Sequence, residues 1–289
     1  MKIKILIPVY NDFQSLSKVI QEINSIISSL DEEFSIIIVN DASTDKTEID
    51  VSSIDKIHSI KILNIKKNQG HARCIATGLK YIFENEEFNC VIPMDGDGED
   101  RPEEIKNFVE SINFSPDKAI VGERVKRTEK LIFKICYKIH KALTYLSTGQ
   151  SIKFGNYTCL PKLTVEKMIN EKATWSSFSG ALQKVEKDKI EVPSERGVRY
   201  FGPSKMSFLN LIKHSLSIIS VFKFNVLIRS VLFLVVYLFL ISENISNVTL
   251  IPFYLVILLN ILTFYFSNRE NINEFNNSLE NINSVEQIK

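Results

Sequence analysis

The sequence predicts an α/β fold with a mostly parallel sheet, followed near its end by a hairpin of two membrane-spanning helices. Over residues 1–122, short apolar runs alternate with segments whose apolar residues recur at helical spacing. This pattern is typical of strands that alternate with crossover helices. Residues 226–241 and 248–266 are instead almost continuously apolar. The hydrophobic share of 45% over 289 residues is therefore an average of two unlike parts.

Five apolar runs in the first part have the length of buried strands. They are residues 3–9, 34–39, 60–65, 89–94 and 119–121. Helical spacing predicts helices between them, over residues 13–27, 70–83 and 102–109. Strands that alternate with helices form parallel sheets covered on both faces, and ligands bind beyond the carboxyl ends of such strands. The polar residues that follow each strand are therefore where we expect the chemistry.

The middle and the end of the chain are less regular. Residues 129–146 have a helical pattern, and residues 206–222 are apolar with scattered polar residues. The second segment is either a helix on a membrane surface or an ordinary amphipathic helix packed in the protein. The Asn/Glu-rich end predicts a loosely ordered tail. The expected division is an α/β domain over 1–205, a juxtamembrane helix over 206–224, a transmembrane hairpin over 225–267 and a polar tail over 268–289.

The two apolar segments are long enough to cross a bilayer. Residues 248–266 carry no charge, and a helix of that length spans roughly 28 Å. Arg229 stands near the start of the first segment, where its side chain can reach the membrane interface. Two buried helices of a soluble core are the alternative, but such helices usually keep a polar stripe. Lys223 and Arg269 flank the hairpin while its short loop holds only Glu243, which predicts cytoplasmic termini.

Charge is distributed unevenly along the chain. The net charge of +1 argues against a general nucleic-acid binder, which would be strongly basic. Residues 122–141 nevertheless hold seven Lys/Arg, and residues 192–225 hold five. Two such clusters, one beside the apolar hairpin, indicate an anionic ligand or anionic lipid headgroups. A basic collar attracted to lipid without any catalytic role is the alternative interpretation.

Four acids follow the fourth predicted strand within six residues: Asp95, Asp97, Glu99 and Asp100. Like charges this close repel one another unless a cation neutralises them. Carboxylate oxygens suit Mg²⁺ or Mn²⁺ shared with substrate phosphates. We therefore expect Asp95, Asp97 and Glu99 to bind one of these metals, with a solvated acidic turn as the alternative.

Four segments together carry a family resemblance. PVYND at 8–12, NDASTD at 40–45, NQGHARCIATG at 68–78 and MDGDGED at 94–100 occur in the order typical of family 2 glycosyltransferases with the GT-A fold. The chain resembles that family over about residues 1–125. The resemblance implies that Asp97 binds a metal bridging the donor diphosphate. It implies a nucleotide site bordered by Pro8, Tyr10 and Asp12, with Asp41 at the base and Asp95 at the ribose or metal edge.

Two motifs in the second half of the sequence resemble a narrower group within this family. GERVKR at 122–127 and RGVRYFGPSK at 196–205, together with the apolar hairpin, resemble the polyprenyl-phosphate glycosyltransferases, which include dolichol-phosphate mannose synthase. The resemblance implies that phosphate oxygens are held by Arg127, Arg199, Ser204 and Lys205. The sequence departs from this group in two places. Glu99 stands where Gln is common, and GNYT at 155–158 stands where the group has a GDFR-like segment.

The number of acids that could act as a general base helps to decide whether the acceptor is a sugar hydroxyl or a phosphate. Transfer to a sugar hydroxyl needs such a base, whereas a phosphate monoester, with a second pKa of about 6, is largely an anion near neutral pH. Between Gly149 and Val185 the only acids are Glu166 and Glu171, with no paired Glu-Asp motif. The sequence therefore favours an inverting, metal-dependent enzyme that moves a sugar from a UDP- or GDP-sugar to undecaprenyl or dolichyl phosphate.

Two alternatives stay open at this point. One is a membrane-tethered family 2 enzyme that acts on a cell-surface saccharide. The other is a non-catalytic paralogue that binds nucleotide sugar or lipid. The sequence leaves open whether the chain forms a homo-oligomer, and we expect no nucleic-acid partner.

Overall fold

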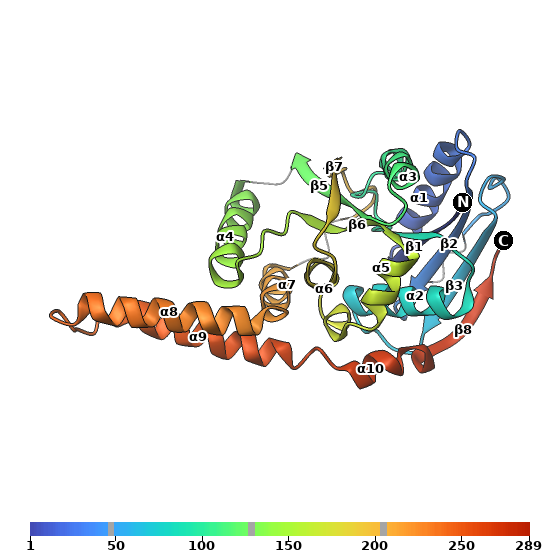
Figure 1. Cartoon of the computed structure of the whole chain (residues 1–289). Helices are drawn as coiled ribbons and strands as arrows, with labels where there is room; N and C mark the ends of the chain where they lie inside the picture. Colours follow the sequence, from blue (N-terminus) through green and yellow to red (C-terminus); the bar gives the residue numbers. More distant parts are fainter. Residues whose placement is uncertain (46–48, 127–130, 203–206) are drawn as a thin grey trace. The chain divides into compact units, whose positions relative to one another are not determined.

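A computed structural model of the chain describes all residues except 46–48, 127–130 and 203–206 (Figure 1). It divides into two compact units. The sheet unit comprises Met1–Thr128, Lys153–Lys205 and Asn271–Lys289, and the helical unit comprises Glu129–Ile152 and Met206–Glu270. The segment Glu129–Ile152 therefore groups with the C-terminal helices, whereas the sequence placed it in a continuous α/β domain over residues 1–205. The last residues return to the sheet unit.

The sheet unit is built on one mixed sheet with the strand order β7-β5-β6-β4-β1-β2-β3-β8. Its strands are β1 (Lys2–Val9), β2 (Glu33–Asn40), β3 (Ser59–Ile65), β4 (Cys90–Pro93), β5 (Ala119–Lys126), β6 (Phe154–Pro161), β7 (Lys189–Glu195) and β8 (Ile282–Gln287). The pairs β1–β2, β1–β4, β2–β3 and β5–β7 are parallel. Strands β6 and β8 pair antiparallel with their neighbours. The five predicted strands are confirmed. Strands β7 and β8 extend the sheet at its two edges, and β6 lies between β5 and β4.

Helices cover both faces of the central strands, as predicted for a buried parallel sheet. Ile3, Ile5 and Ile7 of β1 belong to the same buried core cluster as the apolar side of α1 (Phe13–Ile27) and α3 (Ile105–Phe114). The opposite face of β1 packs against α2 (His71–Asn85), where a Cβ on Gly78 would lie 2.3 Å from Leu6. The remaining described helices of this unit are α5 (Lys162–Ile169), α6 (Phe178–Val185) and α10 (Ile272–Asn276), with short 3₁₀ turns at Pro102–Glu104, Lys172–Trp175 and Ser278–Asn281.

The C-terminal residues are ordered, and the prediction of a loosely ordered tail over 268–289 is wrong. Strand β8 pairs antiparallel with β3 and closes that edge of the sheet. Just before it, Phe275 of α10 is fully buried and stacks on Trp175, with 5.6 Å between the ring centroids. We call residues 271–289 the C-terminal strap. One buried aromatic side chain and one edge strand anchor it, in spite of its polar composition.

The helical unit contains α4 (Leu131–Thr148), α7 (Phe208–Ser220), α8 (Lys223–Ile241) and α9 (Ile251–Ser267). Figure 1 shows α8 and α9 side by side, joined by a short turn. By length and composition, the chain has two helices that could cross a membrane, one at α8 and one beginning with α9. Only 11% of each apolar stretch is buried inside the protein. A core helix of a soluble protein would be mostly buried.

Arg229 of α8 has a different partner from the one its sequence position suggests. Instead of pointing only to a membrane interface, its guanidinium donates to the carbonyl of Leu146 at 3.4 Å. Asn225 donates to the carbonyl of Thr148 at 3.2 Å. A Cβ on Gly149 would lie 2.5 Å from the Arg229 guanidinium, so the glycine makes room for it. These contacts satisfy carbonyls at the end of α4, where a cation also suits the helix dipole.

Candidate active site

Three acidic residues follow neighbouring central strands, at the carboxyl ends of these strands. Asp12 comes after β1, Asp41 directly after β2, and Asp95 just after β4. Strands β2, β1 and β4 are adjacent and parallel, so their carboxyl ends meet at this edge. The predicted location of the site is the one where ligands bind in open α/β sheets.

Asp41 anchors the start of α2. Its side chain is buried, and its two carboxylate oxygens accept hydrogen bonds from the backbone N–H groups of Gln69 at 2.7 Å and Gly70 at 2.9 Å. Gly70 has a φ of +90°, in the region that favours glycine. The carboxylate thus fixes how α2 enters the site.

The acidic loop, residues 95–100, is held by its own backbone. The N–H of Asp95 donates to Asp100 at 2.9 Å, and the N–H of Glu99 donates to Asp97 at 3.0 Å. Burial and the charge of Asp95 raise the pKa of Asp97 to about 6 and that of Asp100 to about 7. Burial would raise the pKa of Asp95 too, but the neighbouring His71 outweighs burial and lowers it. The charge of this loop therefore needs cations to balance it.

A second chain segment lies along the acidic loop. We call residues 196–201 the arginine segment. The N–H of Gly197 donates to the carbonyl of Glu99 at 2.8 Å, and the N–H of Tyr200 donates to that of Asp97 at 3.0 Å. Backbone pairing therefore fixes the register between the two segments, and the spacing of the arginines sets which carboxylate each one meets.

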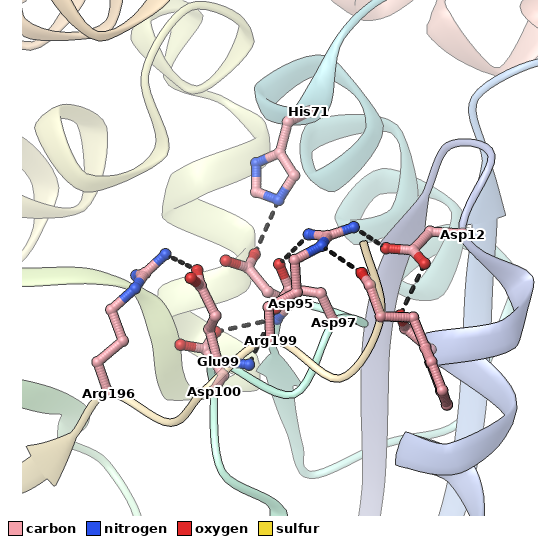
Figure 2. Close-up of polar contacts among 10 residues, drawn as sticks. Asp12, His71, Asp95, Asp97, Glu99, Asp100, Arg196 and Arg199 are labelled. Carbon is pink, nitrogen blue, oxygen red and sulfur yellow. Dashed lines mark hydrogen bonds and ion pairs between the residues drawn. The ribbon is translucent and has the colours of Figure 1, made fainter. Parts of the chain in front are cut away.

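The arginines pair with acids that the sequence assigned to metal or nucleotide. Arg199 donates to Asp97 at 2.7 Å and also to Asp12, which it joins to the acidic loop (Figure 2). Arg196 pairs with Glu99. Arg199 was predicted to hold phosphate oxygens, and the structure brings it to the predicted donor side of the site.

His71 at the first turn of α2 is a site residue that sequence reasoning did not assign. Its Nε2 lies 2.9 Å from Oδ1 of Asp95 (Figure 2), and its Nδ1 lies 3.4 Å from the amide nitrogen of Asn156 on β6. The charge of Asp95 outweighs burial and raises the pKa of the imidazole. The available signal was a histidine directly after the glycine that precedes α2, inside the segment at 68–78 that carries part of the family resemblance.

Pro8 and Tyr10 stand at the end of β1. Pro8 pairs in register with Val39 of β2 and belongs to the sheet. Tyr10 is exposed, at 44%, at the carboxyl edge where the nucleotide was predicted. The predicted residues Arg127, Ser204 and Lys205 lie outside the described residues.

The donor set suits a divalent cation. Asp95, Asp97 and Glu99 offer carboxylate oxygens, the ligands that Mg²⁺ and Mn²⁺ prefer. In the part of the chain that the structure describes, no three His, Cys, Asp or Glu side chains converge as a preformed metal site. Each of the three carboxylates is instead paired with a basic side chain of the protein. By donor chemistry the residues fit a divalent ion that would replace the arginines at Asp97 and Glu99.

Residues 4–162 match the profile of the glycosyl transferase family 2, which is more than half of the chain. The chain belongs to this family. Its fold is similar to glucosyl-3-phosphoglycerate synthase from Mycobacterium tuberculosis, solved with UDP, at 14% identity and a TM-score of 0.54, covering 78% of this chain and 80% of that one.

Two further structures support the same fold. Mannosyl-3-phosphoglycerate synthase from Rubrobacter xylanophilus matches at 13% identity and a TM-score of 0.53, over 76% of this chain and 72% of that one. The mannosyltransferase PcManGT from Pyrobaculum calidifontis, solved with GDP-Man and Mn²⁺, matches at 13% identity and a TM-score of 0.50, over 96% of this chain and 86% of that one. The sheet unit of this family 2 glycosyltransferase therefore has the GT-A fold, and the arginine segment lies beyond the matched residues.

Proposed function

We propose that this family 2 glycosyltransferase is an inverting enzyme that transfers a sugar from a UDP- or GDP-sugar to a polyprenyl phosphate. The observation that carries the proposal is the contact of Arg199 with Asp12 and Asp97. It supports a site in which a basic segment meets the carboxylates that would serve the donor. A donor diphosphate and an acceptor phosphate both need such cations.

The donor half of the proposal uses the acidic residues at the sheet edge. Asp12 and Asp41 would border the nucleotide, and Asp95, Asp97 and Glu99 would hold Mg²⁺ or Mn²⁺. The ion, when bound, supplies positive charge against the leaving nucleoside diphosphate. The presence of Mn²⁺ with GDP-Man in the Pyrobaculum calidifontis mannosyltransferase supports this choice of metal and donor class.

The acceptor half uses basic residues. Arg199, together with Arg127, Ser204 and Lys205, would hold the phosphate of the lipid. One phosphate oxygen attacks the anomeric carbon in line with the departing diphosphate, so a carbon–oxygen bond to the acceptor forms as the bond to the donor breaks. Attack from the opposite side inverts the configuration. No proton has to leave the acceptor, because the phosphate is already ionised near neutral pH.

Among the described contacts, neither of the two acids between Gly149 and Val185 touches the acidic loop. Glu171 caps the 3₁₀ turn at Lys172–Trp175 and pairs with Lys184 at 2.9 Å. Glu166 is exposed on α5. A sugar-hydroxyl acceptor would need a base at the reacting atom. The positions of these two glutamates therefore favour a phosphate acceptor.

The apolar helices α8 and α9 would anchor the enzyme in the membrane that contains this lipid. The charges that flank the hairpin favour a topology with both chain ends in the cytoplasm. A cytoplasmic site suits a nucleotide-sugar donor.

The proposal is tested with the purified full-length chain in detergent. Undecaprenyl or dolichyl phosphate is mixed with a panel of UDP- and GDP-sugars and Mg²⁺ or Mn²⁺, and the lipid product is identified by mass. We expect one glycosylated lipid phosphate, loss of product with EDTA and loss in Asp97→Ala. Asp188→Asn is the control, since Asp188 is exposed and pairs only with a surface lysine among the described contacts. Transfer to an oligosaccharide instead of the lipid phosphate, or near-normal turnover in Asp97→Ala, would contradict the proposal.

A further inference from the structure

His71 lies between the backbone groups that bind Asp41 and the acidic loop. It is the first residue of α2, directly after the backbone N–H groups that bind Asp41. Its Nε2 reaches Asp95 in the acidic loop at 2.9 Å. The side chain of His71 is about half exposed, at 48%. The residue is therefore held by a fixed helix start and still borders open space at the sheet edge.

The second ring nitrogen of His71 has its own partner. The amide nitrogen of Asn156 is 3.4 Å from Nδ1. An amide NH₂ can only donate, so Nδ1 accepts in this contact. A neutral imidazole then carries its proton on Nε2, which donates it to the Asp95 carboxylate. In this series of hydrogen bonds, Asn156 donates to His71 and His71 donates to Asp95.

We infer that His71 is a positioning residue that orients the Asp95 carboxylate toward the divalent cation. The inference rests on the proposed function, because it presupposes a metal at the acidic loop. Carboxylates that bind metals depend on hydrogen bonds from residues behind them, and the loss of such a partner typically costs 10–100-fold in metal affinity or activity.

The test measures the Mn²⁺ affinity of the full-length protein with UDP and, separately, with GDP, from the electron paramagnetic resonance signal of free Mn²⁺. We expect His71→Leu to weaken binding about 10–100-fold. His71→Gln should retain most of the affinity, because the glutamine amide can still donate to Asp95. The matched control is His58→Leu, since His58 is exposed just before β3, at the opposite end of the parallel strands.

Three outcomes contradict parts of this scheme in different ways. Wild-type protein that binds Mn²⁺ with neither UDP nor GDP would overturn the metal assignment of the proposed function, and this inference with it. Wild-type binding that His71→Leu leaves unchanged would overturn the inference alone. Pulsed resonance spectra that show an imidazole nitrogen directly bound to Mn²⁺, lost in His71→Leu, would also overturn it, because His71 would then be a ligand. We expect no such nitrogen coupling in the wild type.

Discussion

The guanidinium of Arg199 lies 2.7 Å from the carboxylate of Asp97, and both side chains are largely buried. The same guanidinium also reaches Asp12. A cation of the protein therefore balances the carboxylates that are proposed to serve the donor and its metal. Before a metal can bind Asp97, this contact has to break.

Replacement of Arg199 should accordingly change metal binding and turnover in opposite directions. A hydrogen bond between charged groups contributes about 1.5–3 kcal/mol, so Arg199→Gln should bind Mn²⁺ about 10–100-fold more tightly in the absence of nucleotide. Turnover should fall at least about 100-fold, because the phosphates lose a cation. Mn²⁺ affinity and turnover are measured on the same preparation. The first comes from the electron paramagnetic resonance signal of free Mn²⁺ and the second from the mass of the lipid product. Weaker Mn²⁺ binding in Arg199→Gln would show that the arginine supports the metal site instead of competing with it.

Gly98 in the acidic loop should not tolerate a side chain. Its φ is +89°, and a Cβ there would lie 2.5 Å from the ring of Tyr200. That ring is held by a hydrogen bond to Glu22 and by the ammonium of Lys18, 4.1 Å from its centroid. Gly98→Ala should therefore displace the arginine segment and lower turnover more than tenfold.

Gly202→Ala is the matched control for this change. Gly202 has a φ of +67°, but nothing lies within 4 Å of the position of its Cβ. It therefore shares the backbone strain, about 1 kcal/mol, without the clash. Equal turnover of the two variants would show that strain, and not the contact with Tyr200, governs the loop.

The sequence predicts the central sheet and its acidic edge well, because both follow from local patterns. Each central strand is a continuous apolar run, and parallel strands bring their carboxyl ends together. Asp12 and Asp97 could be placed at one edge for this reason. Which cation each of them meets depends on the arginine segment, about 100 residues beyond the acidic loop. Likewise, nothing near His71 in the sequence indicates its contact with Asp95, which depends on how α2 packs.

The C-terminal strap was missed for a related physical reason. Strand β8 is an edge strand with mostly exposed residues, so it lacks the apolar run that marks a buried strand. Its hydrogen-bond partners are distant in sequence, as in the contact of Asn64 with Ser284 at 3.0 Å. One aromatic residue, Phe275, supplies the buried anchor. Composition averages over such a segment and predicts disorder.

A buried cluster at the opposite end of the strands should make stability depend on pH. Glu86 accepts from Lys61 at 2.6 Å and from Lys4 at 3.0 Å, and Lys4 is only 7% exposed. Burial would raise the pKa of Glu86, but the two lysines outweigh it and lower the pKa below the ordinary 4.5. The carboxylate therefore stabilises the fold above about pH 4.5, and this contribution is lost as the pH falls through the lowered pKa. We expect Glu86→Gln to cost about 3 kcal/mol near pH 7, because Lys4 is left unpaired, and less in acid.

The adjacent Glu87 is the control for this prediction. It pairs with Lys2 at 2.5 Å, but its side chain is 86% exposed. Exposed ion pairs contribute little, so Glu87→Gln should leave the free energy of unfolding nearly unchanged. Thermal unfolding of the full-length protein from pH 7 to about pH 3 separates the two. A similar cost for both variants would show that burial of Lys4 does not determine the effect.

Phe275 should hold the C-terminal strap to the sheet unit. It is fully buried and stacks on Trp175, whose indole N–H donates to Glu274 at 2.9 Å. Loss of a buried Phe side chain costs about 3–5 kcal/mol, so Phe275→Ala should lower the melting temperature by on the order of 10 °C. Val285→Ala is the matched control, because Val285 is 47% exposed on the same strap. If Phe275→Ala unfolds at the temperature of the wild type while β8 stays protected from hydrogen exchange, the strap is held by strand pairing and not by its aromatic anchor.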